Sequence, residues 1–250
     1  MFKKLLIKPY LILFSIVLIG TNCSDKKETC FYTSGKEITQ DLRLGEFKYL
    51  NLNDNIDYYL KKDTANWIEL TCNEKTLSLI EIKITSDELK ISNSATCNFF
   101  RNYETKNKAI IHYKSIEKIN FTGSKKIISL DTISTKYLYV HLLKGAGSIQ
   151  LMIDCDRFET SATGYGDLTI LGKTNSYFVE QKEISTYNLL DLKTKDSIRI
   201  IQKSINKMKI NGESCVIRGK IEKSGNIYYK GSPLNIDIEQ LYKGKLISLN

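Results

Sequence analysis

The sequence predicts an all-β protein dominated by a β-solenoid, a right-handed parallel β-helix, with a less regular β-strand section before it. No stretch after residue 40 keeps a helical period over three turns, whereas short alternating and β-branched runs recur. From residue 114 onward, apolar positions recur about every 20 residues, often with glycine nearby. The composition, 42% hydrophobic and 26% charged over 250 residues, is ordinary for a globular protein and excludes long disorder and a disulfide miniprotein.

Residues 1–22 are expected to be a lipoprotein signal peptide. Three lysines begin the chain, and residues 11–19 form an apolar run too short for a permanent membrane helix. The Gly-Thr-Asn-Cys end at 20–23 resembles a bacterial lipoprotein box, although Asn22 stands where a small residue is usual. We expect lipidation at Cys23. A plain signal peptide with an incidental cysteine is the alternative.

Residues 23–44 are expected to be a polar tether between the acylated cysteine and the folded domain. Multiple acyl chains anchor stably because each buried methylene contributes ~0.8 kcal/mol. The predicted partner is therefore a membrane, reached through the lipid anchor, and the predicted location is the bacterial cell envelope after export. Without the three signal lysines, 34 bases face 28 acids, a net charge of +6 spread along the chain. This pattern indicates a solvated surface rather than a nucleic-acid partner, and affinity for acidic glycans or anionic membrane surfaces is the alternative.

The cysteines and histidines give no sign of a metal or cofactor site. The chain has two histidines, and no CxxC or Cys-His cluster occurs. Five cysteines follow Cys23, so at least one is free or pairs between molecules. The pairing of Cys30, Cys72 and Cys97 is left open. Free, buried thiols are the simplest interpretation of Cys155 and Cys215.

Residues 45–113 are expected to form the N-terminal β section. Short runs separated by Asn, Asp and Lys turns indicate closely spaced strands, typical of a meander or of irregular first turns of a β stack. The predicted strands lie near 47–52, 56–61, 67–72, 78–85, 87–92 and 108–113.

Residues 114–250 carry the repeat. Its apolar anchors are Ile127, Ile149, Leu168, Leu189, Met208, Ile227 and Leu246. The spacing of 19 to 22 residues, with two strands per unit, predicts parallel strands ~4.8 Å apart around a continuous core. Glycines two and four residues before several anchors would permit positive φ or close approach of neighbouring turns. An antiparallel sandwich is the rival fold, which the regular step disfavours.

The repeat register separates two of the cysteines. Cys155 and Cys215 follow anchors that lie three steps apart, which places the thiols roughly 14 Å apart along the column. A disulfide requires Cα atoms within about 7 Å. We therefore predict that these two cysteines are not bonded to each other.

Several glycine-containing units resemble the head GIN-domain family of auto-transporter adhesins. The units over 121–124, 143–149 and 162–168 are similar to its recurring small-Gly-x-Gly-polar-aliphatic unit, and the segment 224–233 is similar to its terminal unit. Segments 45–48 and 96–103 resemble an opening strand and a cysteine-asparagine-aromatic-arginine segment of its members. The middle units, near Tyr187 and Asn206, lack the glycines.

This resemblance covers roughly residues 45–235 and implies both a fold and a setting. It implies a β-helix similar to those of pectin lyases, without their catalytic residues. It also implies a secreted or lipid-anchored bacterial protein with a role in cell adhesion.

A search of the repeat register for catalytic carboxylates finds no convincing pair. A glycoside hydrolase needs two carboxylates about 5–10 Å apart. The columns one residue before, two after and four after each anchor never hold two adjacent acids. Asp154 and Asp156 come nearest, but a solvated turn is the simpler interpretation, and Asp167 fits a polar ladder. Neither His112 nor His141 lies beside a plausible nucleophile in sequence.

The sequence therefore predicts a non-enzymatic, lipid-anchored envelope or surface protein that acts as a binding or adhesion module. Surface glycans or proteins are the candidate partners. Fifteen tyrosines could stack on sugars or partners, although each is more simply explained by packing in the core or on the sheet. The alternatives are a glycan-acting enzyme, similar to a polysaccharide lyase or hydrolase, and a structural partner of an envelope complex.

Overall fold

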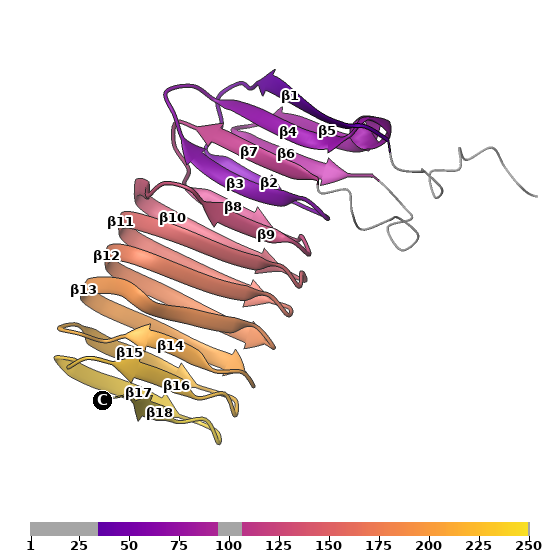
Figure 1. Ribbon diagram of the computed structural model, residues 1–250. Coiled ribbons are helices and arrows are strands. Elements are labelled where there is room, and N and C mark those ends of the chain that lie inside the picture. Colours follow the sequence, from indigo (N-terminus) through magenta and orange to yellow (C-terminus); the bar gives the residue numbers. More distant parts are fainter. Residues whose placement is uncertain (1–34, 95–106, 250) are drawn as a thin grey trace, which may run out of the picture.

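The computed structural model describes residues 35–94 and 107–249 and confirms the predicted fold class. Of the described residues, 67% are in strands and 3% in helix, and they form a β-solenoid of about 7 turns. Figure 1 shows the strands stacked along one column, with the N-terminal strands at one end and the C-terminal strands at the other. Cys23, Cys30 and Cys97 lie outside the described residues.

Among its described residues, the N-terminal section contains seven strands and one 3₁₀ helix. They are β1 (Glu37–Arg43), β2 (Tyr49–Leu52), β3 (Asp57–Lys62), β4 (Trp67–Asn73), η3 (Glu74–Leu79), β5 (Ile80–Thr85), β6 (Glu88–Asn93) and β7 (Lys108–Tyr113). The six strands predicted here are all present, and each starts within two residues of its predicted start. The strand predicted from residue 78 starts at Ile80, because η3 precedes it and is capped by Asn73, whose side chain accepts a hydrogen bond from the Lys75 amide.

The solenoid section contains eleven strands. They are β8 (Lys118–Phe121), β9 (Lys126–Ser129), β10 (Ile133–Leu143), β11 (Ser148–Thr163), β12 (Asp167–Glu183), β13 (Thr186–Ser204), β14 (Met208–Asn211), β15 (Val216–Ile221), β16 (Ile227–Lys230), β17 (Asn235–Gln240) and β18 (Leu246–Ser248). The longest strands continue through a bend and contribute to two faces of the column.

Parallel pairing builds two faces. Face A consists of β6, β2, β8, the C-terminal halves of β10 to β13, then β15 and β17. Face B consists of β7, β3, β9, the N-terminal halves of β11 to β13, then β14, β16 and β18. This continuous parallel pairing excludes the antiparallel sandwich.

Two of the expected segment boundaries shift. The tether was expected to run to residue 44, but Glu37–Arg43 form β1, which pairs antiparallel with β4. Because β1 is mostly exposed and lies at an edge, its sequence is polar and lacks the apolar alternation that predicts a strand. The solenoid also begins before residue 114, since β2 and β3 already pair in parallel with β8 and β9. The antiparallel pairings of β1 with β4, β4 with β7 and β5 with β6 form the N-terminal cap.

The predicted register holds at every step except those involving Leu189. Ile149 pairs with Ile127 and with Leu168 on its two sides. Leu168 pairs with Tyr187, whereas Leu189 pairs with Ile210, two residues farther on. An aliphatic anchor was assumed, but a tyrosine occupies this rung and its side chain is fully buried. The pairing of β12 with β13 then shifts register twice, which accommodates two extra residues.

Glycines at the turns permit adjacent turns to lie close together. A Cβ at Gly166 would come 2.6 Å from the carbonyl oxygen of Gly147, and one at Gly145 would come 2.5 Å from that of Gly123. Both residues have ordinary φ, so close approach rather than positive φ explains them. Gly164, with φ of 134°, needs glycine's conformational freedom, as do Gly172, Gly219 and Gly231 elsewhere in the solenoid.

Buried polar side chains stabilise the turns that lack glycine. Ser204 Oγ donates to the Glu183 carbonyl at 2.7 Å, and Ser185 Oγ donates to the Lys182 carbonyl at 2.9 Å. Gln202 Nε2 donates to the Asn206 carbonyl at 3.0 Å. All three side chains are fully buried. These hydrogen bonds satisfy the buried polar side chains and connect them to the backbone of the turns.

Candidate binding surface

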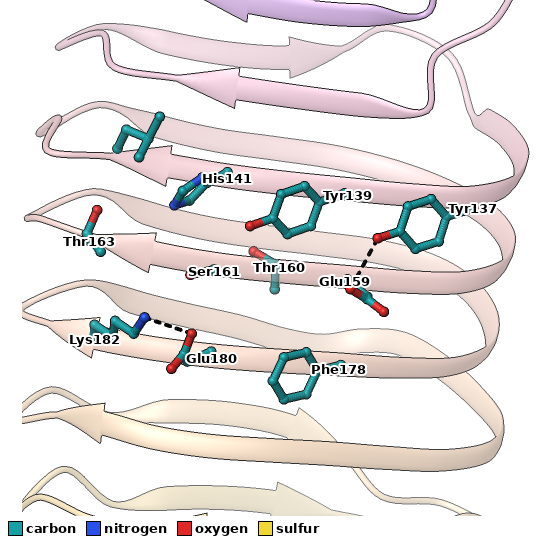
Figure 2. A pocket seen from close by; sticks show the side chains of 11 residues that line it. Tyr137, Tyr139, His141, Glu159, Thr160, Ser161, Thr163, Phe178, Glu180 and Lys182 are labelled. Carbon is teal, nitrogen blue, oxygen red and sulfur yellow. Dashed lines mark hydrogen bonds and ion pairs between the residues drawn. The ribbon is translucent and has the colours of Figure 1, made fainter.

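A concave surface lies on the outside of face A, across β10, β11 and β12 (Figure 2). It has a volume of about 480 Å³, and we call it the face A groove. Its lining residues are Tyr137, Tyr139, His141, Leu143, Glu159, Thr160, Ser161, Thr163, Phe178, Glu180 and Lys182. Most of them alternate with core residues along their strands, because successive side chains of a strand point to opposite sides of the sheet.

Parallel register arranges these side chains in columns. In the first column, Tyr139 lies beside Glu159, and Glu159 lies beside Phe178. Lys118 and Arg199 extend this column at its two ends. The Lys118 ammonium lies 5.9 Å from the centroid of the Tyr139 ring, and the Arg199 guanidinium lies 5.5 Å from that of Phe178. These cation–π contacts hold the two rings from the ends of the column.

The second column runs parallel to the first and carries hydrogen-bonding groups. His141 lies beside Ser161, and Ser161 lies beside Glu180. The rings of Tyr139 and His141 lie 5.7 Å apart at 41°. Burial, together with the nearby cations Lys118 and Lys182, lowers the pKa of His141. The imidazole is therefore neutral at pH 7 and offers one donor and one acceptor.

Both carboxylates of the groove are paired with cations. Glu159 accepts a hydrogen bond of 3.1 Å from Tyr137 Oη and contacts the guanidinium of Arg157. Glu180 lies 2.8 Å from the Lys182 ammonium and 3.5 Å from that of Lys203. The two glutamate side chains are each 19% exposed. The charges at the floor of the groove are thus balanced locally.

A second hollow continues the groove toward the N-terminal end. It has a volume of about 400 Å³ and shares Tyr137 and Tyr139 with the face A groove. The further lining residues are Tyr49, Glu88, Glu117 and Lys118. The two hollows therefore form a path along the column rather than a closed pocket.

Glu159 and Glu180 are the acidic pair that the sequence search missed. They lie on neighbouring rungs in adjacent columns, so their Cα atoms are separated by roughly 8 Å. The search compared positions near the anchors, all on face B or the bend, and never aligned the face A strands. Aligning the second strand of each repeat would have found the pair. Both carboxylates contact cations, Glu159 with Arg157 and Glu180 with Lys182 and Lys203.

Ser161, His141 and Glu180 do not form a catalytic triad. In such a triad the histidine contacts both the nucleophile and the orienting acid. Here the serine lies between the other two, and His141 is two rungs, roughly 10 Å, from Glu180. This column can donate and accept hydrogen bonds, but it lacks the order needed to activate the serine.

The sequence matches, over residues 46–233, the family described as putative auto-transporter adhesin, head GIN domain. The chain belongs to this family. Membership supports a binding or adhesion role and an exposed position at the cell surface or envelope. No match was found among curated proteins.

Three solved structures share the fold of this GIN domain. A putative adhesin from Bacteroides fragilis has a TM-score of 0.77 at 20% identity, covering 86% of this chain and 97% of its own. A putative adhesin from Parabacteroides merdae has a TM-score of 0.66 at 18% identity, with the same coverage. A putative lipid binding protein from Parabacteroides distasonis has a TM-score of 0.65 at 15% identity, covering 86% of this chain and 98% of its own.

The acidic residues singled out in the sequence do not meet in the GIN domain. Asp154 pairs with Lys173 at 3.2 Å, and Asp156 accepts a hydrogen bond from Asn175 at 3.2 Å, both at the bend. Asp167 lies between Ser148 and Thr186 on face B, where the uncorrected register had placed Asn188.

The tyrosines of the GIN domain divide between core and surface. Four of them, Tyr58, Tyr113, Tyr177 and Tyr187, are buried in the core. Tyr137 is 39% exposed in the groove, whereas Tyr165 and Tyr242 are more exposed outside it. Packing in the core therefore explains several tyrosines, and the pair at 137 and 139 belongs to the candidate surface.

The second histidine is part of the N-terminal cap. His112 is buried, its Nδ1 lies 2.9 Å from Asp63 Oδ2, and its ring stacks on Trp67 with centroids 3.6 Å apart. Trp67 Nε1 donates to the same carboxylate oxygen at 3.1 Å. These hydrogen bonds, together with one from the Thr64 amide, hold the pKa of Asp63 well below its usual range.

In the described ranges 35–94 and 107–249, no cluster of three or more His, Cys, Asp or Glu residues is suited to holding a metal ion. Within those same ranges, the structure has no helix of the length and apolar character needed to cross a membrane.

Proposed function

We propose that this protein is an exported, lipid-anchored envelope protein whose GIN domain is a non-enzymatic binding or adhesion module. The observation that carries the proposal is the face A groove, in which aromatic rings and hydrogen-bonding groups are presented outward on consecutive rungs. Aromatic side chains with a polar atom at one end are common at binding surfaces. Family membership supports the same role.

The anchor belongs to the proposal through Cys23, which follows a signal-like segment in the sequence. Acyl chains on that residue would hold the domain at the membrane. Metabolic labelling with a fatty acid, compared between the natural protein and Cys23→Ser, tests this part. Label and membrane association should both disappear in the variant, and a labelled Cys23→Ser protein would contradict the proposal.

The binding role is tested with the full-length exported protein, purified in detergent and applied to bacterial and host-cell surfaces. We expect saturable binding that Tyr139→Ala and Phe178→Ala each reduce by about tenfold or more, the loss of roughly 1.4 kcal/mol of contact energy. Tyr242→Ala is the matched control, since Tyr242 is 57% exposed between β17 and β18 and does not line the groove. Undiminished binding by both groove variants would contradict the proposal.

A glycan-acting enzyme is the second candidate, favoured by the approach of Glu159 and Glu180 on neighbouring rungs. If it is correct, Glu159→Gln and Glu180→Gln would each abolish release of reducing ends from a polysaccharide. The binding-module proposal expects no such release from the natural protein. Detectable turnover that both substitutions remove would replace it.

A further inference from the structure

The arrangement of the face A groove narrows the chemistry of its ligand. We propose that the groove takes a neutral glycan chain lying along the column, with successive sugars crossing successive rungs. This inference rests on the proposed binding function and specifies the ligand class.

The first support is the spacing of the aromatic rings. Tyr139 and Phe178 occupy the same column two rungs apart, which is roughly 10 Å, with Glu159 between them. A sugar unit in a chain is about as long as one strand spacing, so rings on alternate rungs meet alternate sugars. Aromatic rings bind the apolar faces of sugars by stacking. A column in which aromatic rings recur at a fixed spacing therefore suits a polymer whose sugar units recur at a similar spacing.

The second support is the charge balance. Glu159 and Glu180 are the carboxylates of the groove, and both are paired with cations, as described above. Lys182, the ammonium group that lines it, is also engaged in that pairing. A charged ligand would have to compete with these pairs, because a paired carboxylate gains little from a second cation and repels an anion. A neutral ligand leaves the pairs intact.

The third support is the set of uncommitted hydrogen-bonding groups. In the part of the chain that the structure describes, neither the His141 ring nor the Ser161 hydroxyl hydrogen-bonds to another protein group. They lie side by side in the column next to the aromatic one. The neutral imidazole and the hydroxyl can each donate and accept, as can every hydroxyl of a sugar. The aromatic rings of the first column can contact the apolar face of a sugar, while the imidazole and the hydroxyl beside them can hydrogen-bond to its hydroxyl groups.

The extent of the hollow favours a chain over a single sugar. The face A groove and the second hollow share Tyr137 and Tyr139, so a ligand can continue from one into the other. An extended peptide fits less well. From Tyr139 to Leu142 β10 is paired on both sides, as are β11 and β12 under the groove, so these segments offer no free strand edge for backbone pairing.

The test is affinity electrophoresis and calorimetry of the full-length protein in detergent against defined soluble glycans. The neutral probes are mixed-linkage β-glucan, glucomannan, xyloglucan and dextran, and the anionic probes are polygalacturonate and alginate. At least one neutral glycan should bind, and more tightly than either anionic one. Tyr139→Ala and Phe178→Ala should each weaken binding by about tenfold. Tyr242→Ala should leave it unchanged.

The possible results distinguish a failure of the glycan inference from a failure of the proposed binding function. Binding of cell surfaces that the groove variants lose, with no binding of any neutral glycan, overturns the glycan inference and leaves the binding module standing. Preference for polygalacturonate or alginate overturns it in the same way. Glycan or surface binding that is indifferent to both groove variants overturns the two proposals together. Far-ultraviolet circular dichroism and thermal midpoints of each variant exclude misfolding as the cause of lost binding.

Discussion

Tyr137 on β10 donates a hydrogen bond of 3.1 Å to Glu159 on the neighbouring strand β11. The two residues do not share a column, since Tyr137 pairs with Arg157 and Tyr139 pairs with Glu159. The hydrogen bond is therefore diagonal, and it brings Tyr137 to the carboxylate of the residue beside Tyr139. Burial and the Glu159 carboxylate together raise the pKa of Tyr137 to about 12, so its hydroxyl remains a donor at physiological pH.

Replacing Tyr137 by Phe should remove this hydrogen bond and leave Glu159 paired with Arg157. Because the bond is solvent-accessible, we expect the free energy of unfolding to fall by only about 0.5–1 kcal/mol. Urea unfolding followed by circular dichroism measures it. Tyr242→Phe is the control, since that exposed hydroxyl makes no hydrogen bond in the described structure. A loss above about 3 kcal/mol would show that the diagonal bond organises more of the sheet than its contacts indicate.

Substitution of Gly166 by Ala tests the close stacking of turns. The added Cβ would come 2.6 Å from the Gly147 carbonyl oxygen and 2.9 Å from a methyl carbon of Leu142. Because one of these neighbours is backbone, the turns must separate, and we expect a loss of about 1–3 kcal/mol in the free energy of unfolding.

Gly45→Ala is the matched control for this substitution. A Cβ there meets only Ile84, at an ordinary 3.8 Å. The change should be neutral or stabilising by about 0.4–1 kcal/mol, because alanine restricts the unfolded chain. Equal effects of the two substitutions in urea unfolding would contradict the stacking explanation.

The lowered pKa of His141 predicts a pH dependence of stability. Because its folded-state pKa lies below the unfolded value of about 6.5, folding favours the neutral ring. The contribution is fully present above that value and is lost as pH falls toward the folded pKa. The groups that face the ring are Lys118, Lys182, Glu180 and Tyr139, and both lysines oppose protonation.

His141→Gln removes the titration but keeps a neutral polar side chain. The natural protein should lose more stability than this variant between about pH 7.5 and 5, measured by thermal unfolding in matched buffers. The rest of the chain, His112 included, is common to both proteins and cancels in the comparison. Parallel pH profiles would show that His141 does not titrate in this range.

The fold was predictable because its signals are local. Alternation of apolar residues marked the strands between residues 45 and 113, and the spacing of Ile127, Ile149 and Leu168 gave a register that the structure confirms. The error at Leu189 has a physical cause. The strand that contains both residues can place either an aliphatic or an aromatic side chain in the core. Hydrophobicity alone therefore could not show whether Leu189 or Tyr187 occupies the anchor position.

The candidate site was harder to predict, because it depends on which strands are neighbours. Tyr139, Glu159 and Phe178 are separated by about 20 residues each in sequence, and they become one column only in the correct face A register. The repeat gave enough information to place them, but only if the second strand of each unit is aligned as carefully as the first. The neutral state of His141 depends on burial and on lysines from two other strands, which sequence spacing does not reveal.

The thiols provide a test of the column that is independent of the groove. Cys72, Cys155 and Cys215 are buried and free. Cys155 lies on β11, and Cys215 lies directly before β15, three rungs farther along the column. This separation agrees with the prediction that the two cysteines are not bonded to each other. Burial raises the pKa of each of these two thiols to about 11, which leaves almost no reactive thiolate at neutral pH.

We therefore expect iodoacetamide to leave peptides containing these three cysteines unmodified in the native protein and to label them after unfolding. Peptide mass spectrometry distinguishes them from the remaining cysteines of the chain. Rapid native labelling at Cys155, or a peptide that joins Cys155 to Cys215 without reduction, would contradict the register of the column.

Asp63 connects the two aromatic residues of the N-terminal cap, and its loss should be visible in fluorescence. One carboxylate oxygen accepts from Trp67 and contacts His112, while the other accepts from the Thr64 amide. Asn at this position offers a single acceptor oxygen and no charge, so it cannot satisfy both ends. Trp67 is the only tryptophan in the chain, and its emission reports on this cluster.

We expect Asp63→Asn to shift the tryptophan emission to longer wavelength and to lower the thermal midpoint at pH 7. Because the folded-state pKa of Asp63 is depressed, its stabilisation is present above the unfolded value of about 3.9 and is lost as pH falls through the folded value. The difference between the natural protein and the variant should therefore shrink as the solution is acidified below that unfolded value. Asp237→Asn, the same change at an exposed residue of β17, should leave both readouts unchanged at pH 7. A difference at Asp63 that persists undiminished in acid would mean that the lost hydrogen-bond geometry, and not the carboxylate charge, stabilises the cap.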